Sequence, residues 1–344
     1  MTNKLIYEKQ QANALKGVAI LFMLCFHLFA PNPIAPQKGL SFSFTGIDYF
    51  IGQFCDRTVP LYIFMTGYAI TFHMPLFFCI SGYLFKHNRP ITSMAQRLLL
   101  PLLIYMLIIV MPFEINQLIL AKTTIPNIIW RFINVYTSSK ATAFWFPYSL
   151  FLGLAIWGYL GKYKSKILPV ICFISLLIAY LLDFIGLEQK FYPLAINRVF
   201  FILPLLYLGR LYKTQEQFFN ASIITLSIIV LSVLNFIFAN YNCVDMKNGH
   251  FGLPIWSFLS AIATVLLLIK IMKIIDKQGK LPWLSYIGKA SLTIMFTHIV
   301  INQALLYYIG YHPLNFILTI AIGCLLHFFF NKFYLTRFFL LGTK

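Results

Sequence analysis

Lys16 and His27 lie in the first apolar segment of the chain, and their side chains are suited to anion binding and proton transfer. Eleven residues of α-helix turn through about 1100°, or three turns plus about 20°, so both side chains are predicted on one helix face. Along the axis they are roughly 16 Å apart, which matches the reach of an extended pantetheine arm. An imidazole with a pKa of about 6.5 accepts a proton from a hydroxyl at neutral pH. The pair therefore fits a coenzyme thioester with its phosphates at Lys16 and its acyl group near His27.

Each of these two residues also has a structural interpretation. A lysine at the start of a membrane helix commonly anchors the helix by extending its ammonium to the headgroups. A single histidine within a span can hydrogen-bond a neighbouring helix. Since ionisable groups inside a membrane are costly, they are nevertheless functional candidates by default. The shared face of Lys16 and His27 favours the functional interpretation.

Three arginines are further candidates for binding negative charge. Arg97 and Arg89 are predicted at the cytoplasmic surface, where they either hold the phosphates of a coenzyme or anchor their helix. Arg198 is predicted near the outer end of its span. There its guanidinium either stabilises the oxyanion of a thioester, grips a sugar, or pairs with Asp183 or Glu188.

Four more side chains complete the candidate site. His298 falls within a late span and is predicted to assist catalysis or to orient a substrate. Trp145 either stacks on a sugar or coenzyme or belongs to an interfacial aromatic belt. His73 and Ser81 flank a proline, so they either contact substrate or serve helix packing there. The predicted site is thus catalytic His27, His298 and Arg198; cofactor-binding Lys16, Arg97 and Arg89; and substrate-binding Trp145, Ser81 and His73.

The composition places these residues in a membrane. Of 344 residues, 60% are hydrophobic and 10% are charged, against about a quarter charged in an ordinary soluble domain. Helix is required in lipid, because each backbone polar group must be satisfied within its own segment. Apolar blocks of bilayer-spanning length predict an all-α, polytopic bundle of about ten transmembrane helices. They run approximately over 14–30, 59–85, 98–120, 143–160, 167–187, 191–212, 221–239, 254–275, 282–308 and 314–340. One membrane domain over 1–344 is predicted, without a separate soluble domain.

Lysine and arginine are unevenly distributed between the predicted loops. They gather at the start of the chain, after alternate spans and near the end, as at Lys4, Lys86, Lys164 and Lys277. The positive-inside rule places these loops and both termini in the cytoplasm. We therefore attribute the net charge of +18 to contacts with anionic lipid headgroups and not to nucleic acid. A cytoplasmic anionic coenzyme would be attracted by the same field.

A short repeat occurs in the second predicted span. Residues 59–68 contain a Pro-Leu pair followed by Gly-Tyr, and residues 74–83 repeat this pattern. Two separate spans of about 13 residues would be too short to cross a bilayer, and they would break the alternation of charge. One long helix kinked at Pro75 is therefore predicted. The small residues of the repeat either permit close helix packing or serve function.

The cysteines and the first segment exclude some alternatives. The spacing of the cysteines matches neither a disulfide framework nor a Cys/His metal site, so no metal is predicted. They are interpreted as small buried hydrophobic side chains, at Cys25, Cys55, Cys79, Cys172, Cys243 and Cys324. The first apolar block lacks a small-residue cleavage site, so it is predicted to remain as a helix and not to be removed as a signal peptide.

Six motifs follow one another along nearly the whole chain. They are Asn13–His27, Phe72–Leu84, Arg97–Pro101, Phe144–Phe146, Arg198–Gly209 and Ile287–His298. In this order they resemble acyltransferase family 3. The first motif is similar to the opening helix of that family, which carries a basic residue, ten intervening positions and a histidine.

The resemblance implies acyl transfer from a coenzyme A thioester to a hydroxyl of a bacterial surface glycan. It implies acetyl-CoA as donor, a polysaccharide or lipid-linked oligosaccharide as acceptor, no metal, and a multi-pass protein of the bacterial inner membrane. In the family the basic residue is linked to the donor and the histidine to catalysis, which makes Lys16 donor-binding and His27 the general base. Lysine replaces the commoner arginine here, so the charge is kept while the bidentate geometry is lost. Unlike some members of the family, the chain is not expected to carry a hydrolase-like domain after its spans.

Two other classes of function compete with this interpretation. Ten helices with a few buried ionisable groups also describe a transporter or flippase for a lipid-linked saccharide, and a non-catalytic partner in glycan export is a third possibility. The sequence shows no convincing inverted repeat and no pair of interrupted helices in matching positions, which favours the enzyme. Direct transfer and transfer through an acyl-histidine both stay open, as do the identities of the sugar and the hydroxyl.

Overall fold

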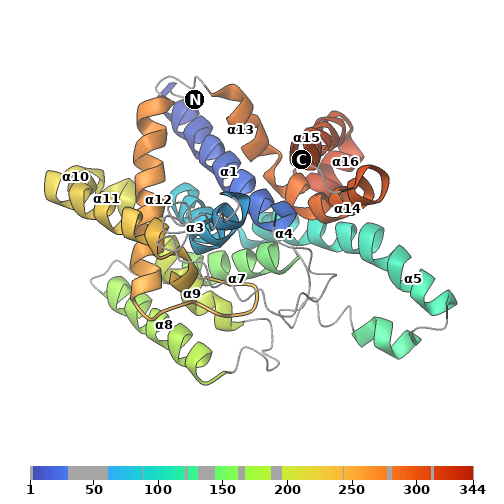
Figure 1. Ribbon diagram of the computed structural model, residues 1–344, viewed down its shortest axis with the longest axis horizontal. Helices are drawn as coiled ribbons and strands as arrows, with labels where there is room; N and C mark the ends of the chain where they lie inside the picture. Colours follow the sequence, from blue (N-terminus) through green and yellow to red (C-terminus); the bar gives the residue numbers. More distant parts are fainter. Residues whose placement is uncertain are drawn as a thin grey trace, which may run out of the picture.

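The computed structural model describes residues 3–29, 61–87, 89–120, 123–130, 144–161, 167–186, 196–242, 244–276, 281–310 and 314–343. These segments are built from α-helices (Figure 1), which confirms the predicted all-α class. The helices are α1 (Asn3–Phe29), α3 (Leu61–Leu84), α4 (Ile91–Tyr105), α5 (Met111–Ile119), α7 (Trp145–Leu160), α8 (Ile167–Phe184), α9 (Ile196–Thr214), α10 (Glu216–Asn220), α11 (Ser222–Ile237), α12 (Trp256–Ile275), α13 (Pro282–Lys289), α14 (Ser291–Ile309), α15 (Leu314–Lys332) and α16 (Tyr334–Leu341). A π-helical segment, Met106–Val110, joins α4 to α5, and a 3-10 turn, Ala239–Asn242, follows α11.

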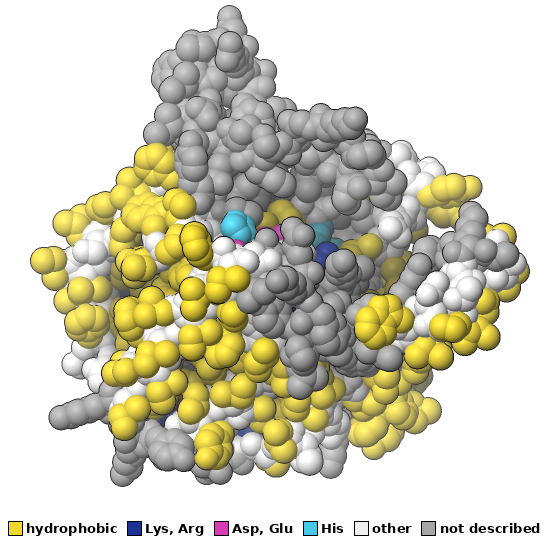
Figure 2. Space-filling view, turned by 90° about the horizontal axis from the view of Figure 1, so that it is seen from below, with side chains coloured by type: hydrophobic (Ala, Val, Ile, Leu, Met, Phe, Trp, Pro, Cys, Tyr) yellow, Lys and Arg dark blue, Asp and Glu magenta, His cyan; other side chains and the backbone are white. Residues whose placement is uncertain are grey.

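Several helices have the length and composition of membrane spans. Among the described residues, five long apolar helices qualify: Ile91–Ile109, Ile167–Phe184, Trp256–Ile275, Ser291–Ile309 and Leu314–Lys332. Their outward surfaces carry exposed hydrophobic side chains; Phe184 on α8 is 89% exposed and Ile317 on α15 is 61% exposed. Figure 2 shows hydrophobic side chains covering much of the described surface. Large apolar surfaces of this kind are covered by lipid in a folded protein. The chain is therefore a multi-pass membrane protein.

Helix α1 is buried among other helices and makes very close backbone contacts. A Cβ atom at Gly17 would overlap the carbonyl oxygen of Leu284 on α13, and one at Gly288 would overlap the carbonyl oxygen of Asn13 on α1. The two helices can approach this closely because both contact points are glycines. Lys16 directly precedes Gly17, so this contact also positions the predicted donor-binding lysine.

Helix α3 runs without interruption through Pro75, so both copies of the Gly-Tyr repeat lie in one helix, as predicted. A Cβ atom at Gly82 would overlap the carbonyl oxygen of Leu206 on α9, and one at Gly209 would overlap that of Cys79 on α3. The second copy of the repeat therefore brings α3 and α9 into backbone contact, as small residues do between membrane helices.

A buried polar network joins α3, α11 and α12. The Asn235 amide donates to the hydroxyls of Thr71 and Thr264, at 2.9 Å each, and its oxygen accepts from the Asn242 amide at 2.9 Å. Asn235 and Thr71 are fully buried. Buried amides are costly unless satisfied, so this network holds the three helices in a defined register.

Four predicted spans differ clearly from the observed helices. The predicted span 14–30 begins at Asn3 and the predicted span 98–120 begins at Ile91. The predicted spans 282–308 and 314–340 each consist of two helices with a bend between them, at Ala290 and at Phe333. Helix α13 is short and buries Leu284 and Ile287 on one face, because that face packs on α1. Hydropathy alone does not distinguish such a helix from the span that follows it.

Candidate functional site

A cavity of about 650 Å³ is lined by residues of α1, α3, α4, α7, α9 and α14 and of the loop between α3 and α4. This volume lies within the range of small-molecule sites, about 300–1,000 Å³. The lining includes six cationic side chains and one carboxylate, that of Glu8; the cations are Lys9, Lys16, Lys86, Arg89, Arg97 and Lys213. Four residues that the sequence analysis selected separately, Lys16, Arg89, Arg97 and Ser81, are thus brought to one cavity.

The cations of this cavity act on one another. Lys16 lies within electrostatic range of Arg97 and Lys9, and Arg97 within range of Arg89. Like charges held together disfavour one another unless an anion binds between them, and a concave surface focuses their field. The cavity is consequently suited to a ligand with several phosphates. The Ser81 hydroxyl is already used, since it donates to the carbonyl oxygen of Phe77 at 2.8 Å.

Three histidines from three helices meet beyond this cavity. The ring centroids of His27 on α1 and His298 on α14 are 4.9 Å apart. Phe26 lies between His27 and the third histidine, His73 on α3. The centroid of its ring is 5.0 Å from that of His27 and 6.1 Å from that of His73. His298 is fully buried and His73 is 4% exposed, whereas His27 is exposed. The structure thus brings together all three histidines that the sequence selected.

Backbone contacts determine the tautomers of two of these histidines. Nδ1 of His298 lies 2.7 Å from the carbonyl oxygen of Met295, and Nδ1 of His73 lies 2.7 Å from that of Ala69. A carbonyl oxygen only accepts, so each Nδ1 carries a hydrogen and each Nε2 is an acceptor. Nε2 of His298 is buried and has no hydrogen-bond partner within the described part of the chain.

The cavity and the histidines are joined by the helices that carry them. Phe77 and Met295 line the inner end of the cavity, and His73 and His298 lie one turn further along α3 and α14, a rise of about 5 Å. On α1 the order is the same, with Lys16 in the cavity and His27 in the histidine cluster. Each of the three helices therefore presents cavity residues at one end and a histidine toward the other.

Arg198, near the start of α9, and Trp145, at the start of α7, lie against each other. Arg198 is 1% exposed, and its guanidinium carbon is 5.3 Å from the centre of the Trp145 ring. Its Nη2 donates to the carbonyl oxygen of Lys247. The alternative in which Arg198 pairs with Asp183 is not observed. Asp183 instead accepts hydrogen bonds from the His250 ring and from the backbone N–H of Phe251. The other alternative partner, Glu188, lies outside the described residues.

Comparison with known proteins shows to which family the chain belongs. A family model for the acyltransferase domain of acyltransferase family 3 matches residues 10–331. The chain belongs to acyltransferase family 3. No curated protein and no solved structure matches it. The match confirms the family resemblance and makes the protein an acyltransferase, an enzyme that takes an acyl group from a donor to an acceptor.

Lys247 is a charged residue near the histidines of this acyltransferase that was not among the candidates selected from the sequence. It lies in the loop between α11 and α12, within electrostatic range of His27 and Arg198. Burial lowers the pKa of its ammonium, Asp245 opposes this shift, and Arg198 adds to it. The available signal was a lysine in a predicted outer loop, where the positive-inside rule expects few basic residues.

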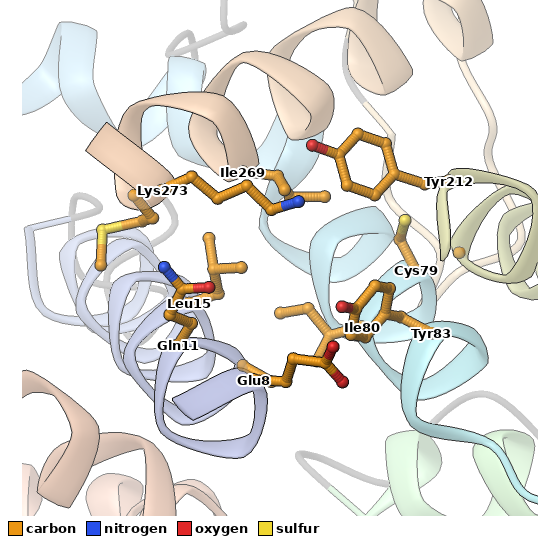
Figure 3. A pocket seen from close by; sticks show the side chains of 12 residues that line it. Glu8, Gln11, Leu15, Cys79, Ile80, Tyr83, Tyr212, Ile269 and Lys273 are labelled. Atoms are coloured by element: carbon orange, nitrogen blue, oxygen red, sulfur yellow. The ribbon is translucent and has the colours of Figure 1, made fainter. Parts of the chain in front are cut away.

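A second pocket of the acyltransferase lies between α1, α3, α9 and α12 (Figure 3). Its volume is about 30 Å³, enough for a water molecule and far too small for a coenzyme. Lys273 extends across it toward Tyr212, and Glu8 points toward Tyr83. Of these two pockets, the cationic cavity is the one with room for an acyl donor.

In the described part of the acyltransferase, no group of three or more His, Cys, Asp or Glu side chains is placed to hold a metal ion. The described cysteines are free thiols, at Cys25, Cys79, Cys172 and Cys324, and the other two lie outside the described residues. The chemistry derived below uses the imidazoles and cations.

Proposed function

We propose that this acyltransferase moves an acetyl group from cytoplasmic acetyl-CoA to a hydroxyl of a cell-surface polysaccharide, O-antigen or capsule. It would act as one domain over 1–344 in the bacterial inner membrane, with about ten transmembrane helices and both termini in the cytoplasm. One observation carries the proposal: α1, α3 and α14 all place cavity residues at the end predicted to face the cytoplasm and a histidine further toward the outside. A donor with an anionic head and a thioester at the end of a long arm fits this polarity.

The donor would bind with its phosphates among the cations of the cavity. Lys16, Arg97 and Arg89 supply charge from two helices and the loop between α3 and α4. The pantetheine arm would extend past Phe77 and Met295, whose apolar side chains line the way to the histidines. Along α1 the distance from Lys16 to His27 is about 16 Å, which an extended arm spans.

His27 is the proposed general base. Its imidazole removes the proton of the acceptor hydroxyl while that oxygen attacks the thioester carbonyl carbon. The tetrahedral oxyanion then collapses, the carbon–sulfur bond breaks, and the proton passes from His27 to the departing thiolate. The products are the acetyl ester and coenzyme A. His27 is the exposed member of the cluster, as a residue that meets two substrates must be.

His298 and Arg198 would support this step in different ways. The Nδ1 hydrogen of His298 is bonded to the backbone, so the free edge of this ring can only accept. We assign it to accept the N–H of His27, which directs the other nitrogen of His27 at the acceptor hydroxyl and stabilises the imidazolium. Arg198, whose buried Nε has no partner among the described residues, remains the candidate donor to the oxyanion. Trp145, His73 and Ser81 are assigned to shape the acceptor and donor channels.

Replacement of His27 tests the proposal. Purified His27→Ala in lipid nanodiscs is expected to transfer radiolabelled acetyl from acetyl-CoA to extracted surface polysaccharide at least about 10²-fold more slowly than the wild type. Binding of acetyl-CoA is expected to be unchanged, because the phosphates bind some 16 Å away. In cells, NMR of the surface polysaccharide should show its acetyl content lost.

His87→Ala is the matched control. His87 is an exposed histidine in the loop after α3, and its removal is expected to leave transfer unchanged. Wild-type rates in His27→Ala at equal protein level would disprove the role of His27. Failure of the wild type to bind acetyl-CoA would disprove the donor.

A further inference from the structure

The loop that carries Lys247 is folded on itself. Asp245 and His250 form an isolated antiparallel bridge. The Asp245 carboxylate accepts from the backbone of Asn248 at 3.2 Å and from the Asn248 amide at 2.7 Å. Both oxygens of Asp245 are thereby used within the loop, which reduces what this carboxylate can offer to a neighbouring cation.

Two helices hold this loop in place. From α8, Asp183 accepts from Nδ1 of His250 at 2.9 Å and from the backbone N–H of Phe251 at 2.7 Å. From α9, Arg198 donates to the Lys247 carbonyl oxygen, and Phe201 stacks on Phe251 with ring centroids 4.5 Å apart. A loop fastened at consecutive points presents its side chains in a defined direction, so the position of Lys247 is determined by the helices beneath it.

The charge balance around Lys247 is positive. Its side chain is half-buried, and within the described part its ammonium forms no hydrogen bond or ion pair. Arg198 beside it is almost fully buried, with Nε unpartnered. The two cations Lys247 and Arg198 and the one carboxylate Asp245 together leave a net positive charge at this place. Retaining such charge at the edge of an apolar bundle is costly, and it is typical of a site that binds an anion.

The place of this charge identifies the ligand. In Figure 2, which looks onto the face opposite the N-terminus, histidine, acidic and basic side chains lie close to one another. Lys247 is within electrostatic range of His27, whereas the donor cavity lies at the other end of the same helices. An anion bound here belongs to the acceptor and not to the coenzyme.

We infer that Lys247, held by Arg198, binds a carboxylate or phosphate group of the acceptor and so directs a neighbouring hydroxyl toward His27. The acceptor class is then an acidic or phosphorylated saccharide. This inference rests on the proposed function, because it names the substrate of the same site. Lys247 touches the acceptor, and Arg198 supports this contact by donating to the Lys247 carbonyl oxygen, in addition to its proposed role toward the oxyanion.

The test compares two changes that remove the same contact. The acceptor is surface polysaccharide extracted from cells lacking this gene, used intact, after chemical reduction of its carboxylates to alcohols, and after dephosphorylation. Lys247→Gln is expected to lower kcat/KM for the intact acceptor between about tenfold and a hundredfold, as loss of a hydrogen bond to a charged group does. The treatment that removes the recognised group should lower kcat/KM of the wild type by the same factor as the Lys247→Gln substitution does. The same treatment should leave kcat/KM of Lys247→Gln unchanged.

The treatments distinguish the two sources of negative charge, since reduction removes carboxylate and dephosphorylation removes phosphate. Lys247→Arg should retain most activity because it keeps the charge. Lys332→Gln, at an exposed lysine ending α15, is the control for loss of one charge. An unchanged melting temperature in Lys247→Gln excludes a folding defect.

The pH profile gives a second readout. His27, Arg198 and Asp245 are the ionisable groups within electrostatic range of Lys247 in the described part. Because burial lowers the pKa of Lys247, its positive charge is lost as pH rises through that lowered value. The ratio of the wild-type kcat/KM to that of Lys247→Gln should therefore be largest at pH values below the pKa of Lys247. It should fall as the pH rises through that pKa.

Two outcomes overturn the inference. One is wild-type transfer that neither treatment of the acceptor changes; the other is a Lys247→Gln defect that is equal on intact and neutralised acceptor. Failure of the wild type to acetylate any form of the acceptor would instead overturn the proposed function, so the two failures are distinguishable.

Discussion

The two ends of the site handle charge in opposite ways. The donor cavity gathers six cations, several of them exposed, around about 650 Å³ of space. The histidine end has few ionisable groups, and most of them are buried and held by individual hydrogen bonds, as His298 and Arg198 are. The first end is suited to attract a flexible, highly charged ligand by summed charge. The second is suited to chemistry, where the position of each atom matters.

The largest effects are expected at the histidine end. His298→Ala should lower kcat about 10²-fold, because His27 loses the acceptor that orients it, while the dissociation constant for acetyl-CoA stays unchanged. Single-turnover transfer and equilibrium binding of acetyl-CoA measure the two quantities. An unchanged kcat would show that His27 is oriented by another group and would remove the proposed difference between the two ends.

Intermediate effects are expected in the donor cavity. Lys16→Gln and Arg97→Gln should each raise KM for acetyl-CoA about tenfold with little change in kcat, since a charge-assisted contact to phosphate is worth about 1.5–3 kcal/mol. Added salt should raise the wild-type KM as well, because exposed charges are screened.

Steady-state kinetics at two ionic strengths measure the change of KM in the two variants and the effect of salt on the wild-type KM. Lys332→Gln is the control for loss of one charge. A loss confined to kcat would contradict the assignment of these two residues to donor binding.

The smallest effect is expected from a residue that touches neither substrate. Gly342 follows α16 with φ +62°, and a Cβ atom there would lie 2.5 Å from the Gln96 carbonyl oxygen and 2.6 Å from the Arg97 Cα. Gly342→Ala should displace the backbone of Arg97 and raise KM for acetyl-CoA by a few fold, with strain of about 1–3 kcal/mol.

Gly310→Ala is the matched control for Gly342→Ala. It has a similar positive φ, and no heavy atom lies within 4 Å of the added Cβ. An equal rise in KM in both variants would show that backbone strain alone, and not displacement of Arg97, is responsible.

Parts of this site were predictable because they depend on local rules. Lys16 and His27 share a helix face through its 3.6-residue period alone, and α1 spans both residues in the structure. Helical class follows from hydropathy, since lipid leaves the backbone no alternative. The bends at Ala290 and Phe333 were not predictable, because each depends on where an amphipathic segment finds a surface to pack on.

The sequence by itself determined that this is an all-α membrane protein of acyltransferase family 3 and which histidines and cations belong to its motifs. Only the tertiary structure decided that His27, His73 and His298 meet, that two of these rings present acceptors, and that Lys247 stands beside them. The physical reason is the distance along the chain over which each effect acts. Helix period and hydropathy act within one segment, whereas the meeting of residues up to 271 positions apart, as His27 and His298 are, depends on how whole helices pack.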